Sequence, residues 1–186
     1  MGSEIPAANV VVLIGVAITA VTDLWKFKVY NLLTLPLLCT GLFYHGFVGG
    51  TGEFTGSLLG ALFGFTVLVP FYCMGGMGAG DVKLMAAVGA WLGMPQTFAV
   101  FIASSLAAGC YALYLIIAHG KVTETYVNFK ILWHRLRAIG RYLGAEDNVE
   151  AAVSRADRAS RLIPFAAMVA IGVLARLAWG KLKGEL

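Results

Sequence analysis

The sequence predicts an all-α, polytopic membrane protein with about six transmembrane helices and a cytoplasmic helical segment between the fifth and the sixth. Of its 186 residues, 59% are hydrophobic and 13% are charged, and the mean hydropathy is +0.80. A soluble domain carries about 25% charged residues. Apolar runs recur along the chain, and most of them have the length of about 20 residues that crosses a bilayer core. We expect residues 1–186 to form a single membrane-embedded domain.

The first three apolar runs lie in the N-terminal half of the chain. Residues 5–22 end at Asp23, and a second run, 32–48, follows a short basic segment. Residues 49–55 are rich in glycine and predict a linker before the third run, 56–74. That run has glycines at positions 56, 60 and 64, a spacing that lets helix backbones approach closely, and we interpret them as a packing surface.

Three further runs occupy residues 82–93, 96–118 and 162–179. Residues 82–93 are too few to cross a bilayer alone, which favours a helix that begins in a hollow of the protein. The N-terminus lacks the basic region of a signal peptide, so the first run is predicted to remain as a membrane helix.

The basic residues predict the orientation. With six crossings, eleven of the 14 Lys and Arg residues fall on one side and three on the other, so the richer side is expected to be cytoplasmic and both termini outside. The first group consists of Lys26, Lys28, Lys83 and eight residues of 121–161, and the second of Arg176, Lys181 and Lys183. Within 121–161, residues 126–143 show the apolar spacing of an amphipathic helix, which is typical of contact with anionic lipids. The sequence leaves open whether this segment also docks a substrate.

The segment Gly-Gly-Met-Gly-Ala-Gly-Asp-Val-Lys, residues 75–83, places four glycines and Asp81 between two apolar runs. A carboxylate at the edge of a bilayer is costly and indicates function. Glycines permit a tight, non-helical path, which membrane proteins tolerate only where protein buries the backbone or water reaches it. We therefore expect a small cavity that contains Asp81.

Asp23 and Asp81 are the two acidic residues, among ten, that border apolar runs on the cytoplasmic side. Two carboxylates in a poorly solvated pocket share one proton. The ionised carboxylate can then activate a water molecule while the protonated one polarises a carbonyl. The residues alone leave two alternatives open: Asp81 can cap the fourth helix, and Asp23 can pair with Lys26.

The histidines and cysteines are isolated along the chain. The three cysteines include no CxxC pair, and the three histidines do not cluster with other ligand types. We expect no metal site, no cofactor and no nucleic-acid partner.

Residues 78–81, Gly-Ala-Gly-Asp, match the GxGD motif of membrane aspartic proteases, and residues 78–89 resemble the type IV prepilin peptidase family. In that family another aspartate opens a D-x5-I-P-N pattern. Here five residues separate Asp23 from Val29, Tyr30 and Asn31, so that Tyr30 stands where the family has proline.

The resemblance implies that Asp23 and Asp81 are the catalytic pair of an aspartic endopeptidase in the cell inner membrane. It would cleave the short basic leader of a prepilin or pseudopilin at the cytoplasmic face. Lacking paired CxxC motifs, the chain is similar to the short, peptidase-only class that serves Flp (tight adherence) pili. The site-shaping residues implied are Asn31, Gly78, Gly80 and Lys83.

The glycines Gly78 and Gly80 would let the backbone approach an extended substrate, and Lys83 would bind lipid headgroups or favour the ionised form of Asp81. Three alternatives remain: an archaeal-type preflagellin peptidase, a presenilin-like protease, and, from another class, a small cation or proton transporter subunit. The sequence does not indicate an oligomeric state.

Overall fold

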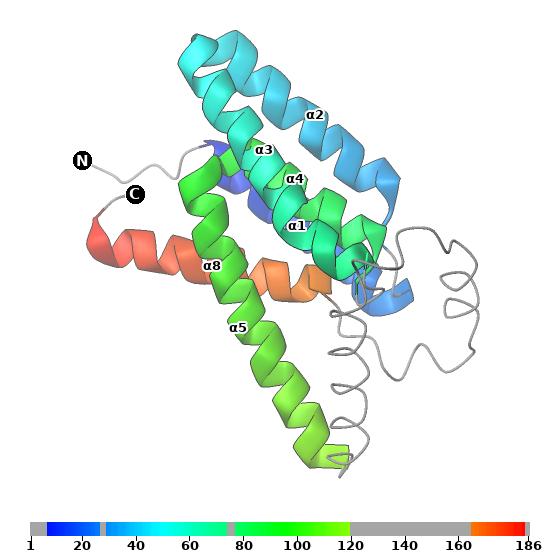
Figure 1. Ribbon diagram of the computed structural model, residues 1–186. Coiled ribbons are helices and arrows are strands. Elements are labelled where there is room, and N and C mark those ends of the chain that lie inside the picture. Colours follow the sequence, from blue (N-terminus) through cyan, green and yellow to red (C-terminus); the bar gives the residue numbers. More distant parts are fainter. Residues whose placement is uncertain (1–6, 27–28, 74–76, 120–164, 185–186) are drawn as a thin grey trace.

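The computed structural model describes residues 7–26, 29–73, 77–119 and 165–184, and nearly all of these residues are helical (Figure 1). The helices are α1 (Ala7–Lys26), α2 (Asn31–Val48), α3 (Gly50–Cys73), α4 (Ala79–Leu92), α5 (Met94–His119) and α8 (Phe165–Lys183). The all-α prediction is therefore confirmed. The expected amphipathic helix 126–143, and the whole segment 121–161, lie outside the described residues.

Five of the helices in these ranges, α1, α2, α3, α5 and α8, are long and apolar enough to cross a membrane. This confirms a polytopic membrane protein. The expected fourth crossing, residues 82–93, corresponds to α4, which has 14 residues. At 1.5 Å per residue, α4 is about 21 Å long and falls short of the roughly 30 Å of a bilayer core. The described ranges thus contain five helices of spanning length and one short helix packed among them.

Two helix boundaries differ from those expected. The linker predicted at 49–55 is wrong, because α3 begins at Gly50, where a positive φ of 74° turns the chain directly out of α2. Glu53 lies in the first turn of α3, where its carboxylate interacts favourably with the positive end of the helix dipole. Helix α1 also continues past Thr22 to Lys26, so Asp23 lies in its last turn rather than after it.

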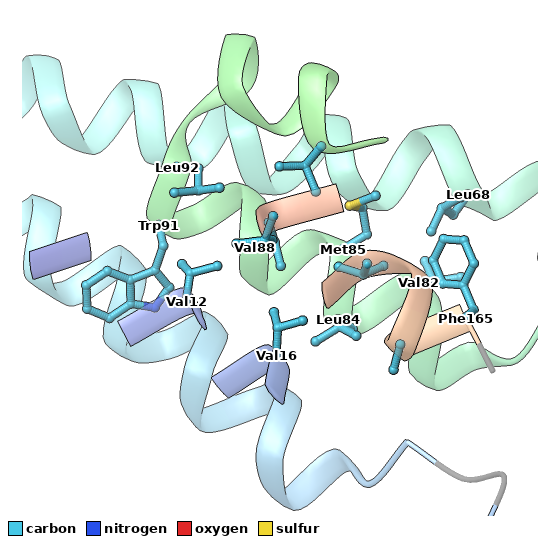
Figure 2. Packing of buried hydrophobic residues seen from close by; sticks show 14 residues of the cluster. Val12, Val16, Leu68, Val82, Leu84, Met85, Val88, Trp91, Leu92 and Phe165 are labelled. Atoms are coloured by element: carbon cyan, nitrogen blue, oxygen red, sulfur yellow. The ribbon is translucent and has the colours of Figure 1, made fainter. Parts of the chain in front are cut away.

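Helix α4 forms the centre of the fold. It contacts all five of the longer helices, and every residue from Val82 to Leu92 except Lys83 is buried. Figure 2 shows the side chains around it, with Val12 and Val16 of α1 on one side and Leu68 of α3 and Phe165 of α8 on the other. A short helix can be buried on all sides because its neighbours supply the contact with lipid.

Glycines let α3 and α4 touch backbone to backbone. A β-carbon on Gly60 would overlap the backbone of Gly89, and one on Gly64 would overlap the backbone of Met85. The packing role expected for Gly60 and Gly64 agrees with this geometry, whereas Gly56 has open space around it. The two pairs, 60 with 89 and 64 with 85, also show that α3 and α4 run antiparallel. The start of α4, which carries Asp81, therefore lies near the end of α3.

Candidate active site

Four helix ends meet at one end of the bundle. They are the last turn of α1, the first turn of α2, the first turn of α4 and the first turn of α8. Each of these ends carries a residue that hydrogen-bonds to another part of the site: Asp23, Asn31, Asp81 and Ala166. Both predicted catalytic aspartates therefore lie in the same region of the fold.

Asp23 is buried, with 6% of its surface exposed. Its Oδ2 accepts a hydrogen bond of 3.1 Å from the backbone N–H of Ala166, the second residue of α8. The first N–H groups of a helix lack partners within it, and their positive end attracts a carboxylate. This contact compensates for the position of Asp23 at the unfavourable, negative end of α1. The alternative pairing with Lys26 involves a side chain outside the described part of the structure.

Asp81 lies in the first turn of α4 and is partly buried. Its Oδ2 accepts the N–H of Gly78 at 3.2 Å, and its own N–H donates to the Gly78 carbonyl at 3.1 Å. Asp81 thus stabilises the helix start as the capping alternative supposed, but from the third helical position rather than as the cap itself. Because of these two bonds the chain is already helical from Ala79, which corrects the expected non-helical path through Gly80 and Asp81.

The carboxylates of Asp23 and Asp81 are close enough for their charges to interact. Asp81 is outside the five spanning helices, and burial raises its pKa to about 7, with the negative charge of Asp23 as the second cause of the increase. The hydrogen bond from Gly78 lowers the pKa and opposes both effects. Two carboxylates coupled in this way retain one proton between them over a wide range of pH.

Gly80 allows α4 to approach the residue before α2. A β-carbon at Gly80 would lie 2.6 Å from the Val29 Cβ and 2.8 Å from the Val29 carbonyl oxygen, so a larger side chain does not fit. Gly78 is less constrained, because a β-carbon there would lie 3.3 Å from Oδ2 of Asp81 and 4.0 Å from the backbone N of Gly80. Gly80 therefore has a packing role against Val29, and its role toward a substrate stays a prediction.

Lys83 and Asn31 contact each other directly. Nζ of Lys83 donates a hydrogen bond of 2.9 Å to Oδ1 of Asn31, the first residue of α2. The structure therefore brings together two of the expected site-shaping residues, and gives Lys83 a protein partner in addition to any lipid headgroup.

The C-terminal end of α3 extends past the site along the bundle. Extending the antiparallel register of α3 and α4 by one turn places Asp81 opposite Leu68, and α3 continues to Cys73. Those five residues correspond to roughly 7.5 Å along the helix axis. Asp81 is therefore recessed from this end of the bundle, and it lies closer to the end of α3 than to the middle of that helix.

Val29 and Ala166 were not identified from the sequence. Val29 occupies a position of the family pattern, which was a usable signal, although the pattern does not reveal that it packs on Gly80. Ala166 contributes through its backbone N–H, and any residue except proline has that group. No side-chain pattern in the sequence indicates it.

The part of the chain that carries both aspartates matches a known family. Residues 10–113, more than half of the chain, match the model of the type IV leader peptidase family. This range contains Asp23, Asn31, Gly78, Gly80, Asp81 and Lys83 and excludes α8. No solved structure shows a significant match to the chain.

Several curated proteins named prepilin leader peptidase/N-methyltransferase are similar to the chain. The one from Aeromonas salmonicida (strain A449) is 37% identical over 118 residues, which are 60% of this chain and 40% of that protein. The one from Neisseria gonorrhoeae is 35% identical over 96 residues, 48% of this chain and 33% of that protein. The chain thus spans less than half the length of these relatives. Because the family model covers most of the chain and both aspartates, the chain belongs to the type IV leader peptidase family.

Proposed function

We propose that the protein is a prepilin leader peptidase, an aspartic endopeptidase that removes the short basic leader of a type IV prepilin. The observation that carries this proposal is the pairing of Asp23 and Asp81, two charge-coupled carboxylates at one end of a helical membrane bundle. Membership of the family supports it independently.

The two aspartates take different roles in the proposed reaction. Asp81, whose pKa burial raises to about 7, begins protonated, and Asp23, whose Oδ2 accepts the N–H of Ala166, begins ionised. Asp23 accepts a proton from a water molecule as the water oxygen attacks the scissile carbonyl carbon, and Asp81 gives its proton to the carbonyl oxygen. When the tetrahedral intermediate collapses, the proton on Asp23 passes to the leaving amine as the C–N bond breaks. The hydroxyl proton of the intermediate then returns to Asp81.

The position of the pair suits a substrate that is itself half in the membrane. A prepilin has a basic leader directly before an apolar helix, so its scissile bond lies at the membrane boundary. The distribution of Lys and Arg supports a cytoplasmic position for the site, in the inner membrane and with both termini outside. Anionic lipids at that face would attract the same basic leader.

We propose further that this chain is a peptidase without methyltransferase activity, similar to those that process Flp-type prepilins. Its curated relatives are named for both activities, but the matched region covers at most 40% of their length. The three cysteines of the chain include no CxxC pair. Incubation with a cleaved pilin and a labelled methyl donor tests this point: label on the new N-terminus would contradict it.

Reconstitution tests the main proposal. The full chain, purified into vesicles with an Flp-type prepilin, should release the leader, whereas Asp23→Asn and Asp81→Asn should each abolish cleavage and still fold. Glu53→Gln serves as a matched control, because Glu53 is an exposed carboxylate in the first turn of α3, at the opposite end of the bundle. Full cleavage by either aspartate variant, or none by the unaltered protein on any type IV prepilin, would overturn the proposal.

A further inference from the structure

The first two residues of α8 lie beside the aspartate site. The N–H of Ala166 binds Asp23, and the preceding residue, Phe165, is buried in the central apolar cluster. In Figure 2 the ring of Phe165 lies beside Leu68 and Val82, and Val82 directly follows Asp81 in α4. One dipeptide therefore bonds to Asp23 of α1 and packs in the same apolar cluster as Val82 of α4, the residue next to Asp81.

Among the described residues, the Asp23 carboxylate has few other hydrogen-bond donors that could replace the Ala166 amide. Asp23 is 6% exposed and Ala166 is fully buried, so water has little access to the carboxylate from that side. A buried carboxylate that loses its donor retains the full cost of desolvation. Without the Ala166 amide, rotation of the Asp23 side chain away from Asp81 and toward solvent becomes favourable.

The packing of Phe165 complements this hydrogen bond. Its ring is 8% exposed, and helix α8 contacts both α1 and α4. Because the aromatic ring fixes the start of α8 against α4, the Ala166 amide is held at a constant place relative to Asp81. The position of the Asp23 carboxylate is then fixed relative to α4, the helix that carries Asp81.

We propose that Phe165 and Ala166 are positioning residues for the catalytic pair, with the Ala166 amide orienting the Asp23 carboxylate and the Phe165 ring fixing that amide against α4. This inference rests on the proposed peptidase function. It assigns a role in that function to α8, which lies outside the region that matches the family model.

Replacing the Phe165–Ala166 peptide bond by an ester, with lactic acid at position 166 of the full chain, removes the hydrogen-bond donor and keeps the methyl side chain. The matched control carries the same ester at Ala167, the next residue of the same helical turn. A hydrogen bond to a charged group contributes about 1.5–3 kcal/mol, so the 166 ester should lower kcat for prepilin cleavage by about 10- to 100-fold. KM should change little, because the amide does not contact the substrate.

A second readout separates orientation from loss of folding. Since the amide stabilises the ionised carboxylate, the acid limb of the pH–rate profile should move to higher pH in the 166 ester and stay in place in the 167 ester. Ala166→Pro and Ala167→Pro repeat the comparison with ordinary residues. Phe165→Ala should lower kcat, and Phe165→Leu, which restores packing, should recover most of it.

The outcomes are distinct from those that test the peptidase function. If the unaltered protein cleaves prepilin, Asp23→Asn does not, and the 166 ester retains kcat within about twofold with an unchanged acid limb, the positioning role is wrong. If both esters lower kcat equally, the effect belongs to the helix end in general and the role is again wrong. Failure of the unaltered protein to cleave any prepilin would instead contradict the peptidase function.

Discussion

Lys83 and Asn31 join the starts of α4 and α2 by a hydrogen bond of 2.9 Å between residues 52 positions apart in the chain. This bond lies two residues after Asp81 and next to the contact between Gly80 and Val29. It therefore connects the glycine motif with the segment that follows Asp23, the two parts of the family pattern.

We expect the Lys83–Asn31 bond to stabilise the site more than the whole fold. Asn31→Ala and Lys83→Met should each lower cleavage several-fold. A double-mutant cycle measured by unfolding in mixed micelles should give a coupling energy of about 0.5–1.5 kcal/mol, because both groups are partly solvated. A coupling energy near zero would show that the two side chains do not depend on each other in the membrane.

Gly80→Ala should damage the enzyme more than Gly78→Ala, although both add one methyl group in the same turn. At position 80 the new carbon meets the backbone and β-carbon of Val29, whereas at 78 it meets the end of a carboxylate at 3.3 Å. Overpacking costs about 1–3 kcal/mol, so Gly80→Ala should reduce kcat/KM by at least about fivefold. Cleavage assays and thermal unfolding of both variants check this, and equal losses would contradict it.

The pH dependence of cleavage should reflect the proton on Asp81. Its pKa is raised to about 7 by burial and by the charge of Asp23, so the protonated form that polarises the carbonyl persists until pH 7. Activity should therefore fall as the pH rises above about 7. In Asp23→Asn the charge is absent, and infrared titration of the Asp81 carboxyl should give a lower pKa than in the unaltered protein; an unchanged value would mean that the two are not coupled.

Glycines in α3 offer a comparison of packing with helix propensity. Gly60→Ala places a methyl group on the backbone of Gly89 and should destabilise the fold by about 1–3 kcal/mol. Gly56→Ala enters open space and should be neutral or stabilising by up to about 1 kcal/mol, because alanine favours a helix. Thermal unfolding in one detergent distinguishes them, and a destabilised Gly56→Ala variant would show that this face has a partner.

The sequence contained enough information to predict the helical membrane fold, the two aspartates and the glycine packing. Asp23 and Asp81 stand out because carboxylates at the edge of apolar runs are rare, and Gly60 and Gly64 because their spacing places them on one face of a helix. Each of these signals is local in the chain.

The features that were wrong or missed depend on contacts between distant parts of the chain, or on how far a helix extends past its apolar run. Residues 49–55 look like a linker, yet α3 begins at Gly50. The contact of Ala166 with Asp23 spans 143 positions and uses a backbone group that every helix start has. Neither hydrophobic periodicity nor composition predicts such a contact.

The burial of α4 has a consequence for the depth of the Asp81 carboxylate. Helices that face lipid adjust their tilt when bilayer thickness changes, because their apolar length must match the hydrocarbon core. Helix α4 is enclosed by five other helices and joined to α3 through backbone contact at two glycines. The distance from Asp81 to the end of the bundle is therefore fixed by contacts within the protein. A change in bilayer thickness does not act on α4 directly.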